Sequence, residues 1–212
     1  MGESTMYVPK YFKVQDIEEI KDFINKYSFG TIVSTHQGKP IATHLPLELN
    51  QKDGAHYISG HMAYGNPQWK TFESGQDDVL VIYQGPHAYI SSSWYHHENV
   101  STWNYQAVHV YGTPKIIDEQ ELEQDLIKLM EKYEKHRENP VLWKTLSPQT
   151  KKQIKGIVGF KIKIKEIQAA YKLSQNRNEE DYHHIIKKLQ VEGDPQSLKM
   201  AEIMEKQSSN RK

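Results

Sequence analysis

The end of a strand and the start of a helix are predicted within residues 60–70, a stretch rich in groups that bind anions. Asn66 followed by Pro67 is typical of a helix start, because Asn caps the helix and Pro fits its first position. The free N–H groups of a first helical turn favour an anion, and Gln68 and Lys70 add donors. The stretch therefore predicts a phosphate site. The alternative is a capped surface helix without a ligand, and a Walker loop is excluded because the Gly-Lys-Ser/Thr ending is missing.

Aromatic and polar side chains gather in a second stretch, residues 84–95 and 101–105. Trp, Tyr, His and Asn lie close to the pair Gly85-Pro86. Such a group suits a stacking surface for a planar ring, with polar side chains that orient it. A polar aromatic core or a subunit interface is the alternative interpretation.

A third candidate is the polar run Lys172-Leu173-Ser174-Gln175-Asn176-Arg177. Its two cations and its amide and hydroxyl groups could hold an anionic or hydrogen-bonding ligand. The alternative is a solvated loop in which Asn176 or Asn178 caps the terminal helix.

Other site chemistries are disfavoured. The chain has no Cys, which excludes a thiolate nucleophile, a zinc finger and a disulfide scaffold. Eight of its 11 His lie between His36 and His109, yet none has His-Glu-x-x-His spacing, so we expect no metal site. Haem held by one axial His stays an alternative. Ser91–Ser93 lack the Gly-x-Ser-x-Gly elbow of a serine nucleophile, and no catalytic residue is assigned.

The composition favours a globular chain without a membrane span. It has 212 residues and 27 basic and 27 acidic side chains, which argues against a uniformly basic nucleic-acid binder. Its longest apolar runs fall far short of the roughly 20 residues that cross a bilayer. No secretory signal opens the sequence, so we expect a cytoplasmic protein.

Periodicity predicts mainly strands in the first half and mainly helices in the second. An amphipathic helix is expected over 16–27, capped by Asp16, followed by a hairpin of 29–35 with 40–49 and a strand over 55–62 that follows the Asp53-Gly54 turn. Further along we expect a helix from Pro67 to about Ser74, a strand over 79–83 broken by Gly85-Pro86, a strand over 103–117, helices over 118–137 and 148–155, a strand over 160–165, and terminal helices over 179–207.

Helices inserted among consecutive strands do not suit a doubly wound sheet. The pattern instead suits a small, closed, antiparallel β-barrel decorated with helices, a mainly β fold of the α+β class. Residues 1–6 and the last half-dozen residues look loose.

Six short blocks together resemble the PaiB family of bacterial proteins, described as negative transcriptional regulators of protease synthesis and sporulation. They occur in one order over roughly residues 6–190: Met6-Tyr7-Val8-Pro9, Ala42-Thr43-His44-Leu45-Pro46-Leu47, Gly60-His61 with Asn66-Pro67-Gln68-Trp69, Gly85-Pro86-His87-Ala88-Tyr89, Thr102-Trp103-Asn104-Tyr105, and Lys172-Leu173-Ser174-Gln175-Asn176-Arg177.

The resemblance implies a homodimeric FMN-binding split β-barrel over residues 1–170, with a C-terminal loop and helical extension over 171–212. Thr43, His44, Leu45 and Pro46 would line the flavin ring. His61, Asn66, Gln68, Trp69 and Lys70 would lie at the flavin phosphate, with Lys70 as its only cation. Lys172 and Ser174 would lie near the ring, and Trp103 and Asn104 would reach it from the partner subunit.

We therefore expect a PaiB-like transcriptional regulator that binds FMN or a similar planar anion. Three alternatives stay open: a flavin-dependent oxidoreductase, a haem-binding or haem-utilisation protein, and a protein that binds DNA directly. The last rests on lysines of the C-terminal half, where such cations would have to share one face: Lys151, Lys152, Lys155, Lys161, Lys163, Lys165, Lys172, Lys187 and Lys188.

Overall fold

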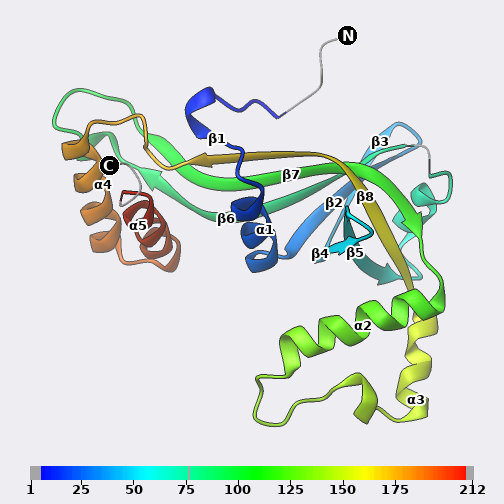
Figure 1. The fold of residues 1–212 in the computed structure, drawn as a ribbon. Helices are drawn as coiled ribbons and strands as arrows, with labels where there is room; N and C mark the ends of the chain where they lie inside the picture. The colour runs from blue at the N-terminus through cyan, green and yellow to red at the C-terminus, as the bar shows by residue number, and fades with distance from the viewer. Residues whose placement is uncertain (1–5, 76, 209–212) are drawn as a thin grey trace. The chain divides into compact units, whose positions relative to one another are not determined.

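The computed structural model describes residues 6–75 and 77–208 and contains eight strands and five α-helices in these ranges (Figure 1). The strands are β1 (Lys13–Val14), β2 (Phe29–His36), β3 (Lys39–Pro46), β4 (Glu48–Lys52), β5 (Ala55–Ala63), β6 (Val79–Ile90), β7 (Thr102–Ile116) and β8 (Ile157–Lys172). The helices are α1 (Ile17–Lys26), α2 (Glu119–Glu134), α3 (Pro148–Lys151), α4 (Glu179–Glu192) and α5 (Pro195–Ser208). The expected loose ends lie largely outside the described residues.

All the strands belong to one antiparallel sheet with the order β3-β2-β6-β7-β8-β5-β4, and β1 pairs with β8. This confirms the α+β fold class. The closed barrel expected from the order of elements is wrong in one respect, because β3 and β4 end the path without pairing to each other. Strand count and alternation predict a curved sheet, whereas closure depends on strand stagger and tilt, which a single sequence does not state.

Local signals place the first helix and both hairpins correctly. Asp16 caps α1 by accepting hydrogen bonds at Oδ1 from the backbone N–H groups of Glu18 and Glu19, at 2.9 and 3.3 Å. The β2–β3 turn has φ of 50° at Gln37 and 77° at Gly38, and the β4–β5 turn has nearly the same angles. Two successive positive φ values match the right-handed strand twist of a two-residue hairpin, which explains the glycines at both turns.

Two predicted elements differ in the structure. Residues 67–72 form a short 3-10 helix, η2 (Pro67–Phe72), where a helix to about Ser74 was expected. Strand β6 runs without a break through Gly85-Pro86, where a break was expected. The break was expected because Pro has no N–H to donate to a strand ladder. Strand β6 pairs with β2 over Leu80–Ile82.

The chain divides into two compact units, and strands β6, β7 and β8 contribute a segment to each. One unit contains Ile24–Ile82 and Val110–Ile167. In it β5 pairs with β8, and Ile117, Leu122 and Ile154 form a core beneath α2. A Cβ atom on Gly159 would lie 2.8 Å from the Leu122 side chain, so α2 packs directly on the β8 backbone.

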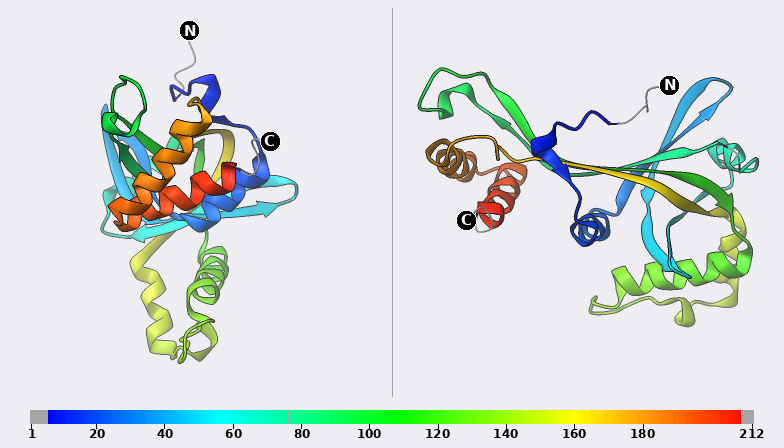
Figure 2. Two further views of the ribbon diagram at one scale, coloured as in Figure 1. Left: turned by 90° about the vertical axis from the view of Figure 1, so that its left-hand side faces the viewer. Right: turned by 45° about the horizontal axis from the view of Figure 1, so that its top comes forward.

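The other unit contains Tyr83–His109, Gln168–Lys212 and the chain up to Phe23. Helices α4 and α5 form a hairpin here, seen in orange and red in both views of Figure 2. Gly193 ends α4 with φ 74°, the left-handed conformation that glycine adopts without strain. Tyr182 of α4 donates its hydroxyl to the Met204 carbonyl of α5 at 2.8 Å, which fixes the hairpin.

None of the helices in the described residues is both long and apolar enough to cross a bilayer. The expected division of the chain at residue 170 stays a prediction.

Candidate functional site

Thr43, expected at the flavin ring, meets Asn66 and Gln68, expected at the flavin phosphate, in one hydrogen-bonded cluster. Thr43 of β3 donates its hydroxyl hydrogen to Oε1 of Gln68 at 2.5 Å, and Asn66 Nδ2 donates to the same hydroxyl oxygen at 2.9 Å. Asn66 Oδ1 also accepts from the backbone N–H of Gln68 at 3.0 Å, which is the cap expected of it. We call Thr43, Asn66 and Gln68 the amide cluster.

Gln68 is the buried member of the amide cluster, with 1% of its surface exposed. Its Nε2 atom donates to the carbonyl oxygens of Ile32 and Ile41 at 3.2 Å and to Ser34 Oγ at 3.1 Å. The side-chain amide of Gln68 thus makes its hydrogen bonds to other groups of the protein. Gln68 therefore ties η2 to β2 and β3 and positions Thr43 and Asn66.

The two residues after Gln68 face outward. Trp69 donates its Nε1 hydrogen to the Tyr64 carbonyl at 2.9 Å, and the two rings lie 5.5 Å apart. Lys70 is exposed, with Nζ 5.8 Å from the centre of the Trp69 ring. A cation over an aromatic face is weakly held, so Lys70 is available to an anion.

The remaining residues of this group lie on neighbouring strands. On β3, His44 is exposed with Nδ1 2.7 Å from Thr31 Oγ1, Leu45 is buried, and Pro46 is half-buried. His61 lies on β5 opposite Gly159 of β8. Burial lowers the pKa of His61 below its ordinary value of 6.5, so this ring is neutral at neutral pH.

A second group lies at the start of β7 and the end of β8. Asn104 Nδ2 donates to Ser174 Oγ at 2.9 Å, and that hydroxyl donates back to Asn104 Oδ1 at 3.1 Å. Both residues are buried, at 0% and 3% exposure, and Ser174 has φ 59°. This pair fixes the turn after β8, which the polar run 172–177 predicted as a loop.

Two side chains of this second group are more accessible. Trp103 is 52% exposed and its ring lies 5.9 Å from those of His87 and Tyr89. Lys172 Nζ donates to Thr102 Oγ1 and lies 5.8 Å from the centre of the Phe12 ring. Burial, and next the charge of Arg177, lower the pKa of Lys172.

The structure thus assembles the predicted residues into two groups, one in each compact unit. The first contains Thr43, His44, Leu45, Pro46, His61, Asn66, Gln68, Trp69 and Lys70, and the second contains Trp103, Asn104, Lys172 and Ser174. The expected contribution of Trp103 and Asn104 from a partner subunit stays a prediction.

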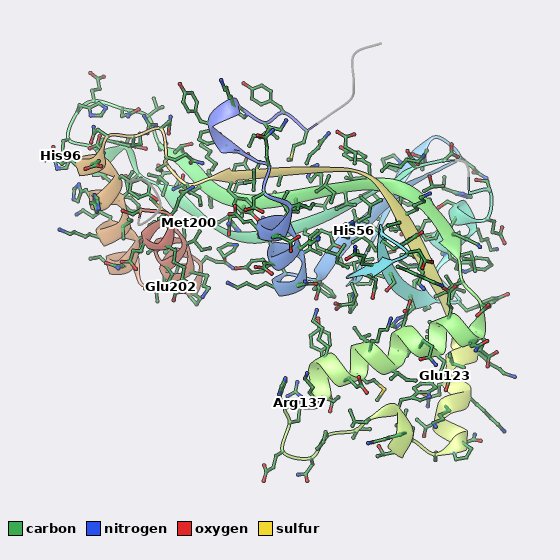
Figure 3. All side chains as sticks on the ribbon, in the orientation of Figure 1. His56, His96, Glu123, Arg137, Met200 and Glu202 are labelled. Atoms are coloured by element: carbon green, nitrogen blue, oxygen red, sulfur yellow. The ribbon has the colours of Figure 1, made fainter. Side chains whose placement is uncertain are left out.

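A buried carboxylate was missed by the sequence analysis. Asp181, 0% exposed, accepts hydrogen bonds at Oδ1 from the His96 backbone N–H at 3.0 Å and at Oδ2 from Asn178 Nδ2 at 2.9 Å. The His96 ring nitrogen Nδ1 lies 2.9 Å away, and Figure 3 marks His96 beside the start of α4. The adjacent pair His96-His97 was the available signal, but nothing in the sequence indicated its partner.

The chain matches the family model described as "Putative FMN-binding domain" over residues 6–166. It is 63% identical over 201 residues to the Protease synthase and sporulation protein PAI 2 of Bacillus subtilis (strain 168), covering 94% of this chain and 97% of the relative. It is also 33% identical over 135 residues to the uncharacterized protein YKL070W of Saccharomyces cerevisiae, covering 53% of this chain and 79% of that protein.

Two solved structures have the same fold. The flavocytochrome Anf3 from Azotobacter vinelandii superposes with a TM-score of 0.60 at 18% identity, covering 84% of this chain and 78% of that chain. The FAD and haem binding protein from Mycobacterium smegmatis superposes with a TM-score of 0.58 at 15% identity, covering 76% and 73%. At these identities the likeness concerns the fold.

Proposed function

Because the chain belongs to the PaiB family of FMN-binding-domain proteins, we propose that it binds FMN as a homodimer and acts in transcriptional regulation. The observation that carries the proposal is the amide cluster. It joins the half-buried hydroxyl of Thr43 on β3 to the half-buried amide of Asn66, and Asn66 lies on the same short segment as the exposed cation of Lys70.

The donor set of this segment fits a phosphate ester. Asn66 uses one Nδ2 hydrogen on Thr43 and has a second to donate, and Lys70 supplies the positive charge. In this proposal Asn66 and Lys70 contact the phosphate, while Gln68 holds the segment in place.

The ring of the flavin needs a flat apolar wall with a few polar groups. Leu45 lies on the same face of β3 as Thr43 and would supply the wall, whereas His44 and Pro46 lie on the opposite face of the strand. Trp103 and Lys172 of a second subunit would complete the site, because both are accessible and neither is needed for the local core.

The case for a homodimer rests on one face of β7. Its even-numbered residues from Asn104 to Pro114 are buried, whereas the odd-numbered ones stay partly exposed. Within the unit that contains Tyr83–His109, this face carries Trp103, Tyr105, Ala107 and His109, of which only Ala107 is neither aromatic nor polar. Tyr and Trp are enriched at subunit interfaces, so a second copy of this chain is the occupant we propose.

Bound FMN supplies the capacity to accept and return electrons. The residues of this chain would bind its phosphate, orient its ring and shield it from water. The neutral state of His61 means that this ring would contribute hydrogen bonding rather than charge at neutral pH.

Titration of the purified chain with FMN, followed by flavin fluorescence, tests the binding proposal. We expect Lys70→Ala and Asn66→Ala each to weaken binding by about tenfold, the usual cost of a lost charge-assisted hydrogen bond. Lys39→Ala, an equal charge change at the β2–β3 turn, is the matched control and should leave the affinity unchanged. Equal affinities for all variants would refute this placement, and a Soret band on haem titration without flavin uptake would favour the haem alternative.

The regulatory role is carried over from the relative named for protease synthesis and sporulation. Expression of this chain in B. subtilis cells that lack PAI 2 should restore its effect on extracellular protease activity and spore counts. A Lys70→Ala variant tests whether that effect needs the ligand. Failure of the wild-type chain to complement would refute the shared role, whatever the result of the FMN titration.

A further inference from the structure

A cavity of about 490 Å³ lies between α2 and the sheet, within the unit formed by Ile24–Ile82 and Val110–Ile167. Its lining comes from the β4–β5 hairpin, the end of β7, the first half of α2 and the start of β8. Side chains from four separate segments therefore converge on one space. None of the residues proposed for FMN lines it.

Five lysines surround the cavity: Lys52, Lys115, Lys128, Lys161 and Lys163. Lys161 pairs with Glu121, with Nζ 2.6 Å from Oε1. The other four form no ion pair within the described chain. The lining includes only three carboxylates, Asp53, Glu121 and Asp125, so the cavity carries an excess of positive charge that an anion would neutralise.

The cavity lining also contains a buried carboxylate oxygen and apolar surface. Asp125 Oδ2 is buried and has no hydrogen-bond partner, since Lys161 Nζ lies 4.0 Å away. A buried acceptor without a donor costs free energy, and a bound group with an N–H or O–H would remove that cost. Tyr57 and the buried Ile117 supply flat and apolar surface beside it.

We propose that this cavity binds a nucleoside phosphate at a site separate from the one proposed for FMN. The phosphates contact the unpaired lysines, of which Lys115 and Lys128 come from different elements. The nucleoside lies against Tyr57 and Ile117 and donates a hydrogen bond to Asp125. The volume suits a ligand of that size, since small-molecule pockets span about 300 to 1,000 Å³.

Isothermal titration calorimetry of the full chain with ATP, in buffer without phosphate, tests the proposal. The double variant Lys115→Glu/Lys128→Glu should bind ATP at least about tenfold more weakly, because two charge-assisted contacts are lost. Lys152→Glu/Lys155→Glu is the matched control, since both lysines are exposed and lie outside the cavity lining. It should bind ATP like the wild type.

Asp125→Ala separates nucleoside recognition from simple anion binding. This variant should bind ATP more weakly, yet bind inorganic pyrophosphate as well as or better than the wild type, because a negative charge has gone. Thermal unfolding of each variant shows that the fold persists. Weakening of both ligands alike, or of neither, would overturn the assignment of Asp125.

Competition between ATP and FMN tests whether the cavity is separate from the proposed FMN site. ATP should bind with the same affinity when FMN is saturating, and Lys70→Ala should not affect it. No ATP binding by the wild type would overturn the proposal, as would displacement of ATP by FMN. Displacement of ATP by a short DNA duplex would overturn it in favour of a nucleic-acid surface. None of these outcomes affects the interpretation of the FMN titration.

Discussion

The hydroxyl of Thr43 on β3 and the side-chain amide of Gln68 in η2 are joined by a 2.5 Å hydrogen bond across 25 positions of the sequence. The same amide reaches β2 through Ile32 and Ser34. One side chain thus holds two strands and the segment that carries Asn66 and Lys70. A buried amide in this role links the stability of the fold to the shape of the candidate site.

Replacement of Gln68 should destabilise the protein. Gln68→Leu removes the donor to the Ile32 and Ile41 carbonyls and the acceptor of Thr43, so the free energy of unfolding should fall by about 2 to 4 kcal/mol. Urea titration followed by tryptophan fluorescence measures it. The same change at the exposed Gln153 should stay within about 0.5 kcal/mol. Similar values for the two variants would contradict the positioning role.

Gly112 is expected to tolerate no side chain. A Cβ atom there would lie 2.2 Å from the Lys163 carbonyl oxygen and 2.8 Å from Ile162 Cγ2, so β7 and β8 would have to separate. Gly112→Ala should cost about 3 kcal/mol or more, at the upper end of overpacking effects. Gly156→Ala meets nothing within 4 Å and serves as the control. The midpoint of thermal unfolding compares the two, and equal midpoints would disprove the close approach.

Asp181 should make the stability depend on acid pH. The backbone N–H of His96, together with side-chain hydrogen bonds from His96 and Asn178, lowers the pKa of Asp181 below its ordinary value of 3.8 despite its burial. Because the folded pKa is below the unfolded one, this stabilisation is present at neutral pH and is lost as the pH falls below about 3.8.

Denaturant titrations between pH 7 and pH 2 measure this effect. Asp181→Asn should lower the stability at pH 7 and flatten its decline at acid pH. Glu179→Gln, an equal charge change at the exposed start of α4, should keep the wild-type decline. A decline of equal steepness in Asp181→Asn would show that this carboxylate is not its source.

The proposed dimer predicts that charge on the partly exposed face of β7 prevents association. Tyr105→Glu would place an unpaired charge in the interface, which costs several kcal/mol in a desolvated site. Light scattering should then report a monomer where the wild type is a dimer. Tyr7→Glu changes a residue that is 87% exposed and should leave the dimer intact. A wild-type monomer, or a dimeric Tyr105→Glu, would disprove this interface.

Periodicity and turn residues predicted most elements, because these signals act over a few neighbouring residues. The Gln37-Gly38 and Asp53-Gly54 turns set their hairpins, and the helix expected over 118–137 is present as α2, which Asp118 caps. The predictions differ from the structure where contacts between residues far apart in the sequence determine the local conformation. Helix η2 is short because Gln68 bonds to β2 and β3, and β6 continues through Gly85-Pro86 although the local signal predicts a break.

The sequence by itself determined the class of fold and the family, since these depend on local patterns and on motifs in a fixed order, and it predicted residues for a phosphate site. The tertiary structure decided which of those residues are available: it buried Gln68, Asn104 and Ser174 and left Lys70 and Trp103 exposed. It also brought Lys52, Lys115, Lys128 and Asp125 around one cavity. The register of β5 with β8 and the packing of α2 on β8 bring these residues together. Both are long-range properties that periodicity along one segment does not contain.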